Sequence, residues 1–104
     1  MAYIPIPQKS WQKTVTTGFN ETIPDGITIA ILNSAIALLA GTIVLPPNPL
    51  DGQPLTILAQ RGIVAAVVSP NTGQSYAGPA LSAAGVWVPI RLKYSGINST
   101  WYPN

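Results

Sequence analysis

The acidic residues are the first place to look for chemistry in this chain, because two carboxylates can act together as acid and base in hydrolysis. The sequence contains three of them, Glu21, Asp25 and Asp51. Asp25 and Asp51 each directly precede a glycine, and an Asp-Gly pair is typical of a turn. We therefore interpret both aspartates as turn residues and not as catalytic acids.

The other common catalytic and metal-binding groups lack the partners they need. The sequence contains no histidine and no cysteine, so a Ser-His-Asp triad and the usual zinc ligand sets are excluded. Its glycines are spaced too irregularly for a phosphate-binding fingerprint. We predict that the protein is not an enzyme and that it uses no cofactor or metal.

The aromatic and basic residues are better suited to binding than to catalysis. Trp87 shares the polar side of an alternating stretch with Arg91, and tryptophan and arginine are frequent anchors of protein interfaces. Two interpretations stay open: contact with another subunit through Trp87, Arg91, Trp101 and Tyr102, or stacking on a glycan through Trp87, Tyr76 or Tyr102. The net charge of +2 comes from scattered residues, which argues against binding to nucleic acid.

The composition points to a surface that is shared with other chains. Of the 104 residues, 47% are hydrophobic and only 8% are charged, whereas about 25% are charged in ordinary soluble domains. A single small domain of this kind exposes apolar patches, which usually mark contact surfaces. Residues 1–10 have the extended pattern of an arm, because each proline in Ile4-Pro5-Ile6-Pro7 restricts its predecessor. The arm either lies across a neighbouring subunit or is a loose terminus.

The elements that position these residues are predicted to be short strands. A central unit, residues 42–58, has two β-branched runs on either side of a proline-rich corner that ends in the turn Asp51-Gly52-Gln53. A second turn is predicted at Asn71 and Gly73. Further strands are expected at residues 11–19, 27–32, 63–68, 86–94 and 100–102, with Pro89 marking either an edge strand or a bulge. We predict a compact antiparallel β-sandwich or small barrel of about seven to nine strands over residues 11–104, with residues 1–10 as its arm.

One stretch allows a different interpretation, since residues 27–45 contain no charged residue and approach the length of a membrane span. The flanking charges are acidic, which gives no positive-inside signal. Asn33-Ser34 interrupts the run with turn-forming residues, and the isoleucines before it alternate with smaller residues. We therefore predict strands here and no membrane span.

Several short motifs agree in order and spacing with a known kind of module. They are Leu45-Pro46, Pro49, Asp51-Gly52-Gln53, Asn71-Thr72-Gly73-Gln74, Tyr94 and Thr100-Trp101-Tyr102. In this pattern the chain resembles a small all-β module that recurs in tailed-phage virion proteins, both in tail-fibre-like chains and in head-decorating proteins. The resemblance implies a role in virion structure and provides no catalytic residues.

The length of the chain favours one member of that group. It is nearly the bare module, without a long upstream repeat, so we expect a capsid decoration (cement) protein on the outer surface of the phage head. The expected partners are other copies of the chain, in a homotrimer, and the major capsid protein, whose adjacent subunits it would bridge. The alternative is a tail-fibre or receptor-binding module that recognises a surface glycan.

Overall fold

The computed structural model describes residues 8–34, 38–60, 63–78 and 89–104 and forms two β-sheets, with no helix among these residues. Nine strands from these described ranges build the sheets. Their bounds are β1 Ser10–Thr14, β2 Phe19–Thr22, β3 Ile29–Asn33, β4 Leu38–Val44, β5 Pro54–Ala59, β6 Ile63–Ser69, β7 Ser75–Tyr76, β8 Ile90–Ser95 and β9 Thr100–Pro103.

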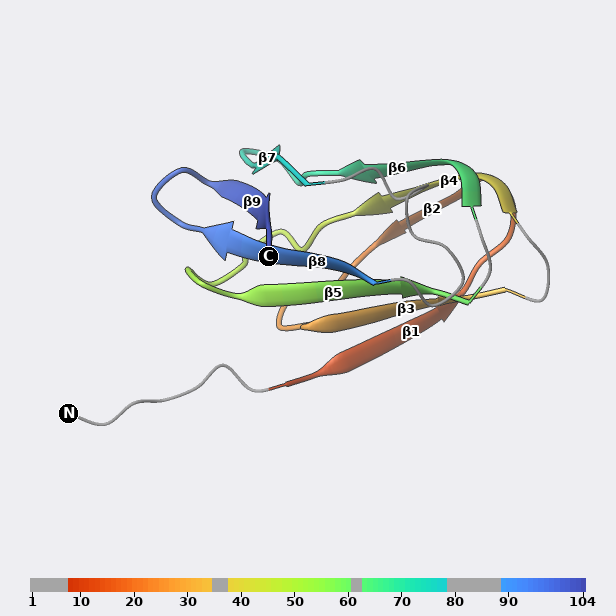
Figure 1. Ribbon diagram of the computed structural model, residues 1–104, viewed down its shortest axis with the longest axis horizontal. Helices are drawn as coiled ribbons and strands as arrows, with labels where there is room; N and C mark the ends of the chain where they lie inside the picture. Colours follow the sequence, from red (N-terminus) through yellow and green to blue (C-terminus); the bar gives the residue numbers. More distant parts are fainter. Residues whose placement is uncertain (1–7, 35–37, 61–62, 79–88) are drawn as a thin grey trace.

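The first six strands alternate between the two sheets. β1, β3 and β5 are neighbours in one sheet, while β2, β4 and β6 form the other (Figure 1). All four neighbouring pairs in these sets are parallel; Ile29 of β3, for example, lies between Ser10 of β1 and Thr56 of β5. The chain therefore winds through three stacked coils, which we number from β1–β2 (coil 1) through β3–β4 (coil 2) to β5–β6 (coil 3).

The last strands extend the first sheet beyond coil 3. The order of this six-stranded sheet is β1-β3-β5-β8-β9-β7. β8 pairs antiparallel with both β5 and β9, whereas the short β7 pairs parallel with β9. Five of the seven pairings between described strands are thus parallel. The predicted all-strand fold is confirmed, but its predicted antiparallel arrangement is wrong.

The core lies between the two sheets and follows from side-chain alternation. In β5, Leu55, Ile57 and Ala59 are buried, while the intervening Pro54, Thr56 and Leu58 point away from the core. Such alternation is expected when only one face of a sheet is packed. The buried cluster draws on both sheets and on their connections: Val15, Phe19, Ile23, Ile27, Ala30, Leu32, Ile43, Leu45, Leu55, Ile57, Ala59, Val68, Ile90, Leu92 and Trp101.

Some predicted strand positions need correction. The single strand expected over residues 11–19 is two strands, because the chain turns at Gly18, whose φ is +83°. β8 begins directly after Pro89 and lies between β5 and β9, so it is not an edge strand. Proline at that position is tolerated because it precedes the ladder and removes no hydrogen bond from it.

The uncharged stretch 27–45 contains β3 and β4, which lie in neighbouring coils, while its residues 35–37 lie outside the described residues. Within the described ranges, no helix has the length and apolar character needed to cross a membrane. At the start of the chain, the hydroxyl of Thr28 accepts a hydrogen bond from the Lys9 N–H at 3.0 Å, which ties the entry of β1 to coil 2. Residues 4–7 of the predicted arm lie outside the described residues.

Candidate functional site

Two turns of the same construction hold the coils together. In residues 50–53 the N–H of the last residue donates to the carbonyl of the first at 3.0 Å, and the same bond closes residues 71–74. The third residue of each turn, Gly52 or Gly73, has φ near +80°, a conformation that glycine adopts without strain. The predicted turn residues Asp51, Gly52, Gln53, Asn71 and Gly73 all lie in these two turns.

The glutamine that ends each turn bonds both to its own turn and to a neighbouring coil. Gln53 is buried; its Oε1 accepts from the Leu50 N–H at 3.0 Å, and its Nε2 donates to the Ile27 carbonyl at 3.1 Å. Gln74 accepts from the Asn71 N–H at 3.2 Å and donates to the Pro46 carbonyl at 2.8 Å. The buried amide of Gln53 must be satisfied in this way, and the partly buried Gln74 makes the equivalent bonds, so both glutamines have a structural role.

The aspartates also bond to backbone groups of neighbouring segments. Asp25 accepts from the backbone N–H and the side-chain amide of Asn48, at 2.8 and 3.0 Å. Asp51 Oδ1 accepts from the Gly96 N–H at 2.8 Å. Each carboxylate fastens one turn to another, which supports the interpretation of both residues as structural.

The bond between Asp51 and Gly96 brings two exposed aliphatic side chains to one end of the molecule. Leu50, next to Asp51, is 59% exposed, and Ile97, next to Gly96, is 92% exposed. We call residues 50–51 and 96–97 the apolar tip. This tip is absent from the predictions made above, although a signal for it is present in the sequence: an aliphatic residue between turn-forming residues has no strand alternation to direct it into a core.

A second apolar area lies on the outward side of the six-stranded sheet, which we call the outer face. Ile31 of β3 is the register partner of Leu58 of β5, and both are partly exposed. Beyond them, β8 contributes the exposed side chains of Arg91 and Lys93, beside Thr56 and Pro54 of β5. The outer face therefore combines an apolar centre with a basic margin.

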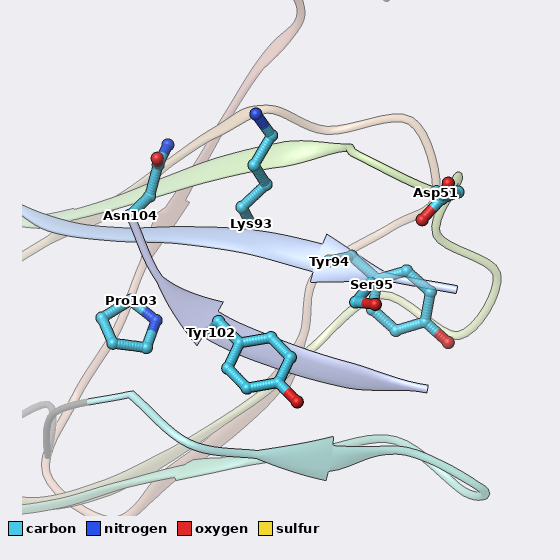
Figure 2. A pocket seen from close by; sticks show the side chains of 7 residues that line it. All are labelled: Asp51, Lys93, Tyr94, Ser95, Tyr102, Pro103 and Asn104. Atoms are coloured by element: carbon cyan, nitrogen blue, oxygen red, sulfur yellow. The ribbon is translucent and has the colours of Figure 1, made fainter. Parts of the chain in front are cut away.

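A groove of about 240 Å³ crosses this basic margin where β8 and β9 pair. Lys93 and Tyr102 lie opposite each other in the two strands, and Figure 2 shows Lys93 between Asn104 and Asp51. Tyr102 is 39% exposed, and its hydroxyl accepts a hydrogen bond from Asn98 Nδ2 at 3.0 Å. The residues that line the groove are Asp51, Lys93, Tyr94, Ser95, Tyr102, Pro103 and Asn104.

The residues predicted to contact another subunit differ in their exposure to solvent. Arg91 and Tyr102 are exposed on the outer face. Trp101 is completely buried; its Nε1 donates to Gln74 Oε1 at 3.0 Å and its ring lies 5.1 Å from that of Tyr94. It therefore offers no surface to a second chain, and that prediction is wrong. Trp87 and Ile4-Pro5-Ile6-Pro7 lie outside the described residues.

In the part of the chain that the structure describes, no group of three or more His, Cys, Asp or Glu side chains is placed to hold a metal ion. Tyr76, the remaining candidate for stacking on a glycan, is partly buried against the core, and burial raises the pKa of its hydroxyl to about 12.

Comparison with protein-family models, curated proteins and solved structures finds no match for this chain.

Proposed function

We propose that this protein is a structural component of a phage virion, a decoration protein that binds the outside of the head as a homotrimer and bridges capsid subunits. The observation that carries the proposal is the apolar tip, where Ile97 and Leu50 are largely exposed. Two large aliphatic side chains at one end of a small chain are unfavourable in water, and burial of each stabilises a contact by roughly 1.5–3 kcal/mol.

The outer face supplies the second part of the proposed capsid contact. Its partly exposed Ile31 and Leu58 provide apolar area, and Arg91 and Lys93 provide positive charge beside it. The chain contains only three acidic residues, and Asp25 and Asp51 already accept hydrogen bonds from neighbouring turns. A second copy therefore has little negative charge to offer this margin, which favours a different protein with an acidic surface as the partner there.

The proposed trimer is supported by the short length, the low charge and the apolar content of the chain. With 8% charged residues, the chain has few charged side chains to keep copies apart. Contacts that each bury about 1,000 Å² or more would be stable. A protein that bridges capsid subunits needs no catalytic group. The candidate site fits this role, because it consists of turns, aliphatic side chains and basic residues.

The test is binding to empty capsids of the phage that encodes the protein. The wild-type chain should sediment with the capsids and behave as a trimer in analytical ultracentrifugation. Ile97→Thr combined with Leu50→Thr should lower capsid occupancy at least about tenfold, the equivalent of 1.4 kcal/mol. Val67→Thr is the matched control, because Val67 is also 56% exposed but lies on β6 of the other sheet.

A wild-type chain that stays monomeric and does not sediment with capsids would contradict the proposal. If the tip variant and Val67→Thr lose capsid occupancy equally, the apolar tip is not a specific contact with the capsid.

A further inference from the structure

The groove between β8 and β9 has the features of a ligand site, and it shares Lys93 and Asp51 with the proposed capsid contact. We infer that it binds a single pyranose unit of an acidic saccharide. Its volume of about 240 Å³ is below the 300–1,000 Å³ that is usual for sites of drug-sized ligands, so it suits one sugar ring. The site goes beyond the proposed role in the virion, and its test needs no capsid.

Tyr102 provides the surface on which the ring would lie. The aromatic face of tyrosine is apolar and electron-rich, so it suits the carbon-bound hydrogens on one side of a pyranose. The hydrogen bond from Asn98 to the Tyr102 hydroxyl, at 3.0 Å, fixes the side chain before a ligand arrives. A platform that is already ordered loses little conformational entropy on binding.

Lys93 provides the charge that selects an acidic sugar. It lies directly across from Tyr102 in the β8–β9 register and is exposed. The only ion pair among the described residues joins Lys13 to Glu21, so the Lys93 ammonium is not bound to a carboxylate of this part of the chain. Figure 2 shows the Lys93 side chain directed away from Tyr102, so its three donors meet a sugar carboxylate beside the ring after this flexible side chain turns toward β9.

Polar groups at both ends of the groove can bind the hydroxyls. Asp51 uses Oδ1 to accept from Gly96, and a carboxylate retains further acceptor positions. At the opposite end, Asn104 offers both an amide donor and a carbonyl acceptor (Figure 2). Asp51 is the only carboxylate side chain in the lining, so the groove lacks the acid–base pair that glycoside hydrolysis requires. It would bind the saccharide without cleaving it.

The experiment is saturation-transfer difference NMR on the full chain with two probes, methyl β-D-glucuronide and methyl β-D-glucoside. The two differ only in the carboxylate that replaces the hydroxymethyl group. We expect transfer to the ring hydrogens of the glucuronide at concentrations up to about 10 mM, and at least tenfold weaker binding of the glucoside. Lys93→Gln should remove this preference, and Tyr102→Ala should abolish transfer from both probes.

Arg91→Gln is the matched control, because Arg91 is the next outward-facing residue of β8 and does not line the groove. This variant should bind the glucuronide as the wild-type chain does. Tyr102→Phe, which keeps the ring and loses only the bond to Asn98, should retain transfer and so separates loss of the platform from loss of folding. The inference is overturned if the glucuronide shows no transfer or if both probes bind equally well. It is also overturned if Lys93→Gln and Arg91→Gln have equal effects on binding.

Discussion

At the scale of single residues, Gly41 shows how closely the strands of the smaller sheet pack. Gly41 of β4 is the register partner of Phe19 of β2, and the Phe19 ring occupies the position that a β-carbon on Gly41 would take. Phe19 itself is only 7% exposed. The ring can therefore close this end of the core only because the neighbouring residue has no side chain.

We predict that Gly41→Ala lowers the free energy of unfolding by about 1–3 kcal/mol, the usual range for overpacking a core. The measurement is urea unfolding followed by tryptophan fluorescence. The double variant Phe19→Leu/Gly41→Ala should recover part of the loss, because the smaller side chain frees space.

Gly52→Ala is the comparison for that prediction. A β-carbon at Gly52 meets nothing within 4 Å, but its φ of +80° strains any other residue; we expect a loss of roughly 1–2 kcal/mol from strain alone. Phe19→Leu should recover stability when it is combined with Gly41→Ala, but not when it is combined with Gly52→Ala. This difference would distinguish overpacking at Gly41 from backbone strain at Gly52. If Gly41→Ala leaves stability unchanged, the Phe19 ring does not pack against Gly41.

Single residues also show where sequence interpretation of the site succeeds and fails. Asp51 and Gly73 could be assigned to turns because the conformation of Asp-Gly and Asn-x-Gly is local. Trp101 and Tyr102 are adjacent in the sequence and similar in character, yet one is buried and the other exposed. Which of them points inward depends on the register of β9 against β8, a long-range property that the residues themselves do not encode.

At the scale of strands, coil 1 differs from the coils stacked on it. Inward positions of β3 and β4 are held by Leu32 and Ile43, which are buried. Their register partners in coil 1 are Lys13 and Glu21. The Lys13 ammonium lies 3.9 Å from the Glu21 carboxylate. This ion pair therefore takes the place of apolar side chains in coil 1, whose strands β1 and β2 are at the edges of the two sheets. Inward-pointing charges are a known protection of edge strands against pairing with another chain.

We predict that Lys13→Leu combined with Glu21→Ile makes the chain associate through β1 and β2. The variant continues the apolar core to the free edge, which then gains stability by pairing with the same edge of a second copy. Sedimentation velocity should show a mass above that of the wild-type assembly, increasing with concentration.

The control places the same apolar side chains on the outward side of the same strands. Gln12→Leu combined with Asn20→Ile leaves the ion pair in place, and it should keep the wild-type mass. Association of this control to the same extent would show that added apolar surface, and not the lost charges, drives pairing.

Strand positions could largely be predicted from the sequence, but their partners could not. β5 and β6 lie close to the expected runs, because alternation and β-branched residues identify strands locally. Alternation is the same in parallel and antiparallel strands, so it carries no information on strand direction. One indication was present: Asp25-Gly26 and Asp51-Gly52 precede β3 and β5, which are neighbours in one sheet. Two copies were too few to establish the winding.

At the scale of the whole molecule, the dependence of stability on pH should be simple. The chain contains no histidine and no cysteine, the side chains whose ordinary pKa lies nearest to neutral pH. Burial raises the pKa of Tyr76 from 10.0 to about 12, because the charged phenolate is poorly solvated inside the protein. Above pH 10 the unfolded chain therefore loses this proton while the folded protein retains it.

We predict that the free energy of unfolding falls as the pH rises from 10 to 12, since the folded state binds more protons in that window. Below pH 10 this contribution is fully present and constant. Urea unfolding of the wild-type chain and of Tyr76→Phe at pH 8 and pH 11 measures it, and the variant should lose less stability between the two values.

Tyr102→Phe is the control, since Tyr102 is more exposed than Tyr76, and its alkaline loss should match that of the wild-type chain. If wild type and Tyr76→Phe lose the same free energy of unfolding between pH 8 and pH 11, Tyr76 does not contribute to the loss of stability at alkaline pH.

The alternation of strands between two sheets also determines how the chain can reach its native state. Among the described strands, β8 and β9 are the only consecutive pair joined by a ladder, while each of β1 to β4 must wait for a strand two places further on. Loop closure must therefore precede most of the stabilising contacts, and chains of this kind fold in milliseconds to seconds. On the ribosome, seven of the described strands emerge before the β8–β9 hairpin, so the nascent chain completes its six-stranded sheet only after β9 has emerged.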